Sequence, residues 1–106
     1  REEDVKALVA STVSEFGRLD VAFNNAGTEG DTGPLVSATE ENYHRIMDTN
    51  VKGMFFSLKH QIPAMLANGG GSIINNASVA GLVGMPTAAL YVASKHAVMG
   101  LTRTVA

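Results

Sequence analysis

The segment Leu-Asp-Val-Ala-Phe-Asn-Asn-Ala-Gly at residues 19–27 decides the fold class of this 106-residue chain. Residues 19–23 form an apolar run with one acid, which is too short for a helix. Such a run predicts a buried parallel strand, because strands covered on both faces need not alternate polar and apolar residues. Before it, apolar residues at helical spacing predict an amphipathic helix from Glu2 to Phe16, which Gly17 ends. A helix, a glycine turn and a buried strand form half of a βαβ unit, so the predicted class is α/β.

Downstream of this strand the sequence predicts a loop and then a long helix. Residues 28–36 contain glycines and a proline without periodicity, which is typical of a loop at the carboxyl end of a strand. Apolar residues at helical spacing then predict a helix from about Glu40 to Ala67. Its N-cap is either Ser37, in a capping box, or Thr39.

Two weak helix formers interrupt this long helix. Asn50 and Gly53 each cost up to about 1 kcal/mol relative to alanine in a helix interior. We therefore expect a break into two helices near Asp48.

The remaining residues complete a strand–helix–strand unit. Residues 72–76 predict a second strand, residues 79–89 a glycine-containing loop, and residues 90–106 a last helix. Two strands alone leave unpaired edges, and a parallel sheet normally needs more of them to bury a core. We expect one partial domain over residues 1–106, truncated at both ends, with helices on both faces of the sheet.

Composition excludes several classes of function. Eight basic and ten acidic residues give a net charge of -2, which provides no basic patch for nucleic acid. The absence of cysteine excludes disulfides and thiolate metal sites and fits a cytoplasmic location. His44, His60 and His96 lack metal-ligand spacing, so no metal site is predicted. No apolar run approaches the roughly 20 residues of a membrane span.

Three polar residues form the candidate catalytic set: Ser78, Tyr91 and Lys95. Ser78 follows the second predicted strand, and Tyr91 and Lys95 lie four apart, on one face of the last helix. A Tyr-x-x-x-Lys pair alone is commonly an ordinary exposed helix pair. Ser78 lacks the glycines of a G-x-S-x-G elbow and no P-loop is present, which argues against a hydrolase or an NTPase. What points to a function is the combination with Asn-Asn-Ala-Gly after one strand and an asparagine inside a helix.

In this order, these features resemble the short-chain dehydrogenase/reductase family, whose pattern is Asn-Asn-Ala-Gly, a helical Asn, a strand-end Ser and Tyr-x-x-x-Lys. The resemblance covers essentially the whole chain. It implies a Rossmann-like doubly wound parallel sheet, of which residues 1–106 are the central part of an NAD(P)-binding domain. In the family the glycine-rich phosphate loop precedes this region, and the implied cofactor is NAD or NADP.

The resemblance also implies a role for each catalytic residue. Tyr91 is the expected general acid/base, and Lys95 supplies a positive charge that favours loss of the phenol proton. Ser78 is expected to hydrogen-bond the carbonyl or alcohol oxygen of the substrate. Asn50 is expected to bind a water through its helix and to link Lys95 to solvent as a proton relay.

The cofactor contacts are likewise implied by the resemblance. Asn24, Ala26 and Gly27 are expected to line the adenosine side of the cofactor, mainly through backbone groups, with glycine where the chain comes close. Lys95 is expected to hold the nicotinamide ribose hydroxyls, with Tyr91 beside it.

Two hypotheses of function follow. The first is an oxidoreductase that moves a hydride between a nicotinamide and the carbon of a small secondary alcohol or ketone, although the 106-residue chain by itself is expected to be inactive. The second is a catalytically incompetent fragment or interaction module of the same ancestry. The helices at 40–67 and 90–106 resemble the pair through which family members form homodimers or homotetramers, and their apolar faces fit that role.

Overall fold

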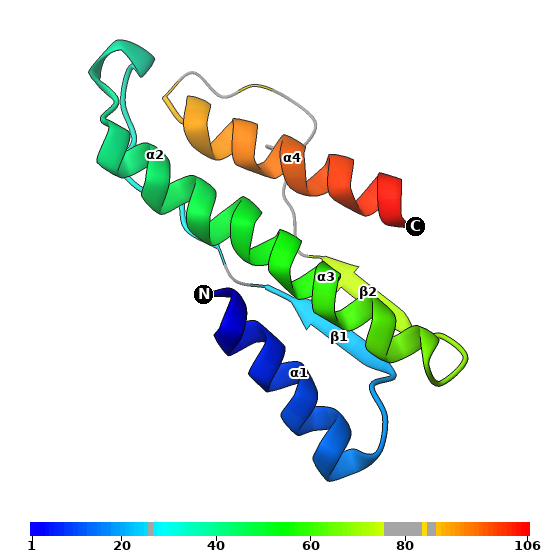
Figure 1. The fold of residues 1–106 in the computed structure, drawn as a ribbon. Coiled ribbons are helices and arrows are strands. Elements are labelled where there is room, and N and C mark those ends of the chain that lie inside the picture. The colour runs from blue at the N-terminus through cyan, green and yellow to red at the C-terminus, as the bar shows by residue number, and fades with distance from the viewer. Residues whose placement is uncertain (26, 76–83, 85–86) are drawn as a thin grey trace.

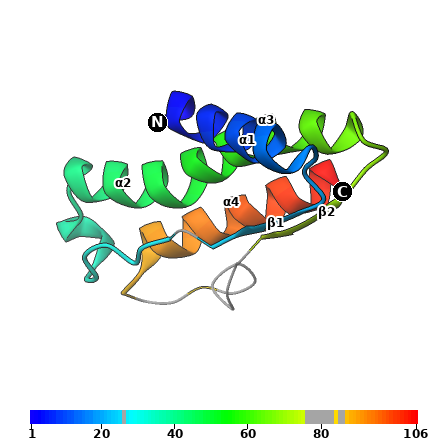
Figure 2. The same cartoon turned by 90° about the horizontal axis from the view of Figure 1, so that it is seen from below.

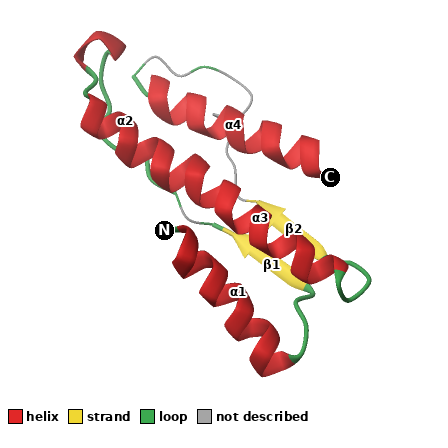
Figure 3. Ribbon diagram, in the orientation of Figure 1, coloured by secondary structure: helices red, strands yellow, loops and turns green. Residues whose placement is uncertain are grey.

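The computed structural model describes residues 1–25, 27–75, 84 and 87–106. Its elements are shown in Figures 1 and 3. In chain order they are α1 (Glu2–Phe16), β1 (Val21–Asn24), a 3-10 turn (Leu35–Ser37), α2 (Glu40–Met47), a π-helical turn (Asp48–Lys52), α3 (Gly53–Leu66), β2 (Ser72–Asn75) and α4 (Ala89–Val105).

The two strands pair in parallel, which confirms the α/β class. Val21 lies opposite Ser72 and Asn24 lies opposite Asn75. The long connection through α2 and α3 provides the crossover that parallel strands require. Both strands fall within two residues of the predicted ranges.

The expected helices on both faces of the sheet are not found among the described residues. In Figure 2 the helices α1, α3 and α4 lie on one side of the sheet, and no described helix covers the other side. The exposure of the strand residues agrees: Ala22 is buried on the helix side, whereas Val21 and Phe23 are each 61% exposed. Because successive side chains of a strand point to opposite faces, this alternation identifies the uncovered face.

The core lies where α3, α4 and β2 meet. Met54 and Leu58 of α3 contact Val98 of α4, which is fully buried, and Ile73 of β2 packs against them. This cluster holds α4 over the helix side of the sheet, with α2 alongside it (Figure 1).

Helix α1 packs against α3, and an ion pair joins the two helices. Lys59 Nζ lies 2.9 Å from Glu2 Oε2, and its hydrogen bond lowers the pKa of Glu2 below the ordinary value. The side chains of Lys59 and Glu2 are 48% and 35% exposed, so solvent screens the pair and we expect it to orient α1 and to add little stability.

The predicted break in the long helix is confirmed and takes the form of a π-helical turn. The backbone N–H of Gly53 donates to the carbonyl of Asp48, five residues earlier, and Asn50 lies in the turn with 1% exposure. Thr39 is the N-cap of α2, because its hydroxyl accepts a 3.1 Å hydrogen bond from the Asn42 N–H. Of the two N-cap alternatives, Thr39 is therefore the correct one.

Candidate functional site

The side chain of Asn50 joins two other parts of the chain. Its Oδ1 accepts a 2.7 Å hydrogen bond from the N–H of Thr28, in the loop after β1. Its Nδ2 donates to the carbonyl of Thr28 at 2.8 Å and to the hydroxyl of Ser94, on α4, at 2.9 Å. The π-turn widens the helix at this point and brings the amide between the loop and α4. Asn50 is thus a structural junction.

Tyr91 and Lys95 lie one turn apart near the start of α4. Lys95 is only 5% exposed, which is unusual for a lysine. Its Nζ lies 5.7 Å from the centroid of the Tyr91 ring, a distance at which a cation and an aromatic ring attract each other. Tyr91 itself is half-buried. The predicted shared face of this pair is therefore observed, and it is turned inward at Lys95.

Gly27 lies where the loop after β1 meets these side chains. A Cβ at this position would lie 3.1 Å from Lys95 Nζ and 3.3 Å from Asn50 Oδ1. Both distances are tighter than ordinary contacts, so a larger residue would displace one of the two groups. The absence of a side chain leaves the Gly27 backbone open beside a buried ammonium group, which is the environment that a sugar hydroxyl or an anionic group of a ligand needs.

The loop that carries Thr28 is fixed to α2 by Asn42. The Asn42 Oδ1 accepts from the N–H of Asp31 at 2.8 Å, and its Nδ2 donates to the Asp31 carbonyl at 3.1 Å. Arg45 adds a contact to the Asp31 carboxylate at 3.1 Å. At the end of the loop, the N–H of Gly33 donates to the carbonyl of Thr87, just before α4. The loop therefore spans from Asn50 to the start of the helix that bears Tyr91.

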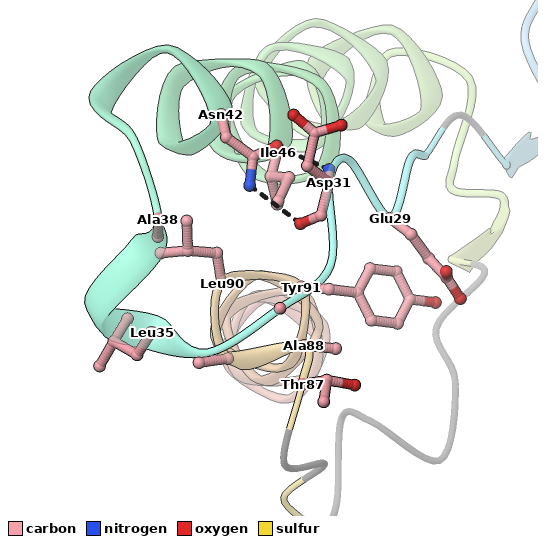
Figure 4. Close-up of a pocket in the computed structure, with 12 residues that line it drawn as sticks. Glu29, Asp31, Leu35, Ala38, Asn42, Ile46, Thr87, Ala88, Leu90 and Tyr91 are labelled. Atoms are coloured by element: carbon pink, nitrogen blue, oxygen red, sulfur yellow. Dashed lines mark hydrogen bonds between the residues drawn. The ribbon is translucent and has the colours of Figure 1, made fainter.

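A small hollow lies between this loop, α2 and α4. It has a volume of about 20 Å³, enough for about one water molecule. In Figure 4 the side chains of Glu29 and Tyr91 both point away from the Asn42–Asp31 pair. The hollow is therefore too small for a substrate.

Not every predicted site residue belongs to this cluster. Asn50, Tyr91, Lys95 and Gly27 are brought together as described above. Asn24 is turned toward the helix layer, where its Nδ2 donates to Gln61 and Asn75 and its Oδ1 accepts from Gln61. Its side chain is thus engaged inside the protein, and only its backbone is left for a ligand.

Two predicted site residues, Ser78 and Ala26, lie outside the described residues. Conversely, sequence reasoning missed Thr28 and Ser94, both of which bind Asn50. Ser94 had one available signal, because it lies four residues before Val98, on the apolar face of the last helix.

Two further properties concern metals and membranes. Among the residues that the structure describes, no three His, Cys, Asp or Glu side chains are grouped closely enough to hold a metal ion. In the same part of the chain, no helix has the length and apolar character needed to cross a membrane.

Comparison with known proteins adds a family assignment. A sequence model of the short chain dehydrogenase family matches residues 1–106. The chain is 53% identical to the 2,5-dichloro-2,5-cyclohexadiene-1,4-diol dehydrogenase of Sphingobium indicum, over all of this chain and 43% of that protein.

Solved structures also resemble this chain over nearly its whole length. An NAD+-bound xylitol dehydrogenase superposes with a TM-score of 0.96 at 40% identity, over 100% of this chain and 41% of that one. The protein ElxO with NADP bound gives a TM-score of 0.94 at 39% identity, over 99% of this chain and 42% of that one. The chain spans about two fifths of the length of these relatives. With its whole length matched by the family's sequence model, the chain belongs to the short-chain dehydrogenase family.

Proposed function

We propose that this chain is the catalytic-end portion of an NAD(P)-dependent oxidoreductase that converts secondary alcohols and ketones into one another, with Tyr91 as the proton-transferring residue. The observation that carries the proposal is the cluster of Asn50, Lys95 and Gly27 beside Tyr91, in a chain of this family. A buried lysine next to an asparagine that joins three segments has little value for stability alone, because burying an ammonium group costs free energy. The presence of a buried lysine at this position therefore fits a chemical role.

The cofactor class is NAD or NADP, since relatives of known structure hold one or the other. When bound, the nicotinamide supplies or accepts the hydride. The residues described here fit such a group, because the bare backbone of Gly27 and the Lys95 ammonium adjoin each other. We propose that Lys95 donates hydrogen bonds to ribose hydroxyls, and that Asn24, Ala26 and Gly27 contribute backbone groups to the adenosine side. Tyr91 completes this set at the nicotinamide end.

The proton chemistry rests on Tyr91 and Lys95. In alcohol oxidation, the Tyr91 hydroxyl oxygen takes the proton from the substrate alcohol after giving up its own, and in ketone reduction it donates one. We propose that the Lys95 ammonium, whose Nζ lies 5.7 Å from the ring centroid, is the positive charge that accompanies this proton transfer. We propose that Ser78 holds the reacting oxygen and that Asn50 links Lys95 to solvent through a water bound to its helix.

The test is an assay of the full-length enzyme with cyclic secondary alcohols and either NAD+ or NADP+, followed by nicotinamide absorbance. Cyclic alcohols are the first choice, because a relative at 53% identity is named for a cyclic diol. We expect reduction of one of the two cofactors that depends on the alcohol. Binding of neither cofactor, measured by titration calorimetry, would contradict the proposal.

The second candidate function, assembly with a second copy of this chain, is favoured by a groove on the outer side of α2, α3 and α4. The groove has a volume of about 720 Å³ and a mainly apolar lining that includes Met47, Val51, Phe55 and Leu101. Phe55 is 47% exposed. An apolar surface of this kind on paired helices fits a homodimer or homotetramer contact.

Phe55→Glu is expected to weaken this assembly. A carboxylate in the groove would have to be desolvated on contact with the other copy, which is unfavourable without a partner charge. Light scattering of the full-length protein should show a shift to a smaller mass. Phe16→Glu is the matched control, because Phe16 is on α1 and already 75% exposed, and it should leave the mass unchanged. An unchanged mass for Phe55→Glu would exclude this surface.

A further inference from the structure

The side chain of Ser94 is fully buried, and Ser94 lies between Tyr91 and Lys95 on α4. It has 0% exposure, follows Tyr91 by three residues and directly precedes Lys95. Serine in the middle of a helix is a weak helix former, and a buried hydroxyl costs free energy unless it is hydrogen-bonded. Ser94 meets that requirement with two hydrogen bonds, and both involve parts of the candidate site.

The two bonds fix the direction of donation. The Ser94 hydroxyl donates its single hydrogen to the Tyr91 carbonyl at 2.7 Å. Toward Asn50 it acts only as an acceptor, so the Asn50 group at 2.9 Å is the NH₂. The Thr28 backbone agrees with this orientation, because its N–H needs the Asn50 oxygen and its carbonyl needs the Asn50 nitrogen. Three independent contacts therefore select one orientation of the amide.

These contacts also use up the donors of Asn50. An amide NH₂ has two hydrogens, and here one goes to Thr28 and the other to Ser94. The Asn50 side chain thus acts as a bracket between the loop and α4, and Ser94 is its attachment point on α4. Without the hydroxyl, one buried N–H of Asn50 would lack its partner, and the amide could rotate or shift away from Lys95.

We infer that Ser94, the residue directly before Lys95, is a positioning residue of the active site. Its hydroxyl fixes the Asn50 amide and thereby links the π-turn to the Tyr91 carbonyl. The inference rests on the proposed function, because it assigns Ser94 to the support of Tyr91 and Lys95. Ser94 touches neither substrate nor cofactor and acts only through these neighbours.

The test compares Ser94→Ala and Ser94→Cys in the full-length enzyme. Cysteine nearly preserves the volume, but its thiol is a weak hydrogen-bond partner, so it keeps the test valid if the alanine variant folds poorly. We expect both variants to lower kcat by roughly 10- to 100-fold, with KM values changed by less than about 3-fold, as for loss of an interaction that matters in the transition state. Ser94→Thr retains a hydroxyl and should recover most of the lost kcat. Ser57→Ala, a half-buried serine on α3, is the matched control and should keep wild-type kinetics.

A second measurement needs no cofactor or turnover. Hydrogen exchange of the Thr28 N–H, which bonds to Asn50 Oδ1, should accelerate by about tenfold or more in both Ser94→Ala and Ser94→Cys. Ser57→Ala should leave it unchanged.

The outcomes separate this inference from the proposed function. Wild-type kcat and wild-type Thr28 exchange in Ser94→Ala and Ser94→Cys would overturn the role of Ser94, even where Tyr91→Phe abolishes activity. If instead Tyr91→Phe stays active while Ser94→Ala still accelerates Thr28 exchange, the proposed function fails and the Ser94–Asn50 bracket stands as a structural link.

Discussion

Tyr91→Phe is expected to lower the kcat of the full-length enzyme for alcohol oxidation by on the order of 10²- to 10⁴-fold, the usual range for loss of a general acid/base. The phenylalanine ring keeps the shape of the tyrosine ring and its position 5.7 Å from Lys95 Nζ, so only the hydroxyl is lost. The KM for the cofactor should change less than kcat, because Lys95 remains to hold the ribose hydroxyls whereas the proton transfer is lost. Steady-state kinetics with the best alcohol from the cyclic panel would measure both values.

Tyr43→Phe is the matched control for this change. Tyr43 is the other tyrosine of the chain, lies on α2 and is 44% exposed. The same loss of a hydroxyl there should leave kcat within about twofold of the wild type, as for most surface substitutions. Near wild-type activity of Tyr91→Phe would show that another group transfers the proton.

The strands and the broken helix could be predicted from the sequence because their signals are local. Residues 19–23 and 72–76 are short apolar or β-branched runs, and each contains most of an observed strand. The break near Asp48 followed from two weak helix formers, Asn50 and Gly53, and the π-turn lies there. Local propensity places such a break to within a few residues.

The form of the break could not be predicted, because it depends on distant contacts. The hydrogen bonds of Asn50 reach Thr28 and Ser94, which are 22 and 44 residues away in sequence. No local pattern relates these positions. For the same reason the four-residue spacing of Tyr91 and Lys95 indicated a shared face but not the burial of Lys95.

The sequence also could not predict which face of the sheet the helices cover or to which side Asn24 points, because the local pattern is the same for both faces. The run Val21–Phe23 is apolar throughout and therefore does not show which face the helices cover. The structure distinguishes them through Ala22, which is buried, and Phe23, which is exposed. Asn24 then points to the same side as Ala22, where it meets Gln61.

Gly30→Ala is expected to destabilise the full-length protein by about 2 to 5 kcal/mol. Gly30 has a φ of 64°, in the left-handed region, where a residue with a Cβ costs about 1–2 kcal/mol. The added Cβ would also lie 2.5 Å from Asn42 Oδ1 and 2.6 Å from Ile46 Cγ1. Overpacking of this kind costs a further 1–3 kcal/mol or so. Urea unfolding of the wild type and the variant would measure the difference.

Gly17→Ala separates the two causes. Gly17 has a φ of 84°, but an added Cβ there would meet nothing within 4 Å, so only the backbone strain of about 1–2 kcal/mol should appear.

The Gly30→Ala and Gly17→Ala variants should also differ in activity. The clash at Gly30 pushes on Asn42, which holds Asp31 and therefore the loop that carries Thr28, the partner of Asn50. We expect kcat to fall in Gly30→Ala and to stay at the wild-type value in Gly17→Ala. Equal losses of stability in both variants would show that Asn42 and Ile46 make room for the Cβ, and that the loop is held less firmly than its hydrogen bonds imply.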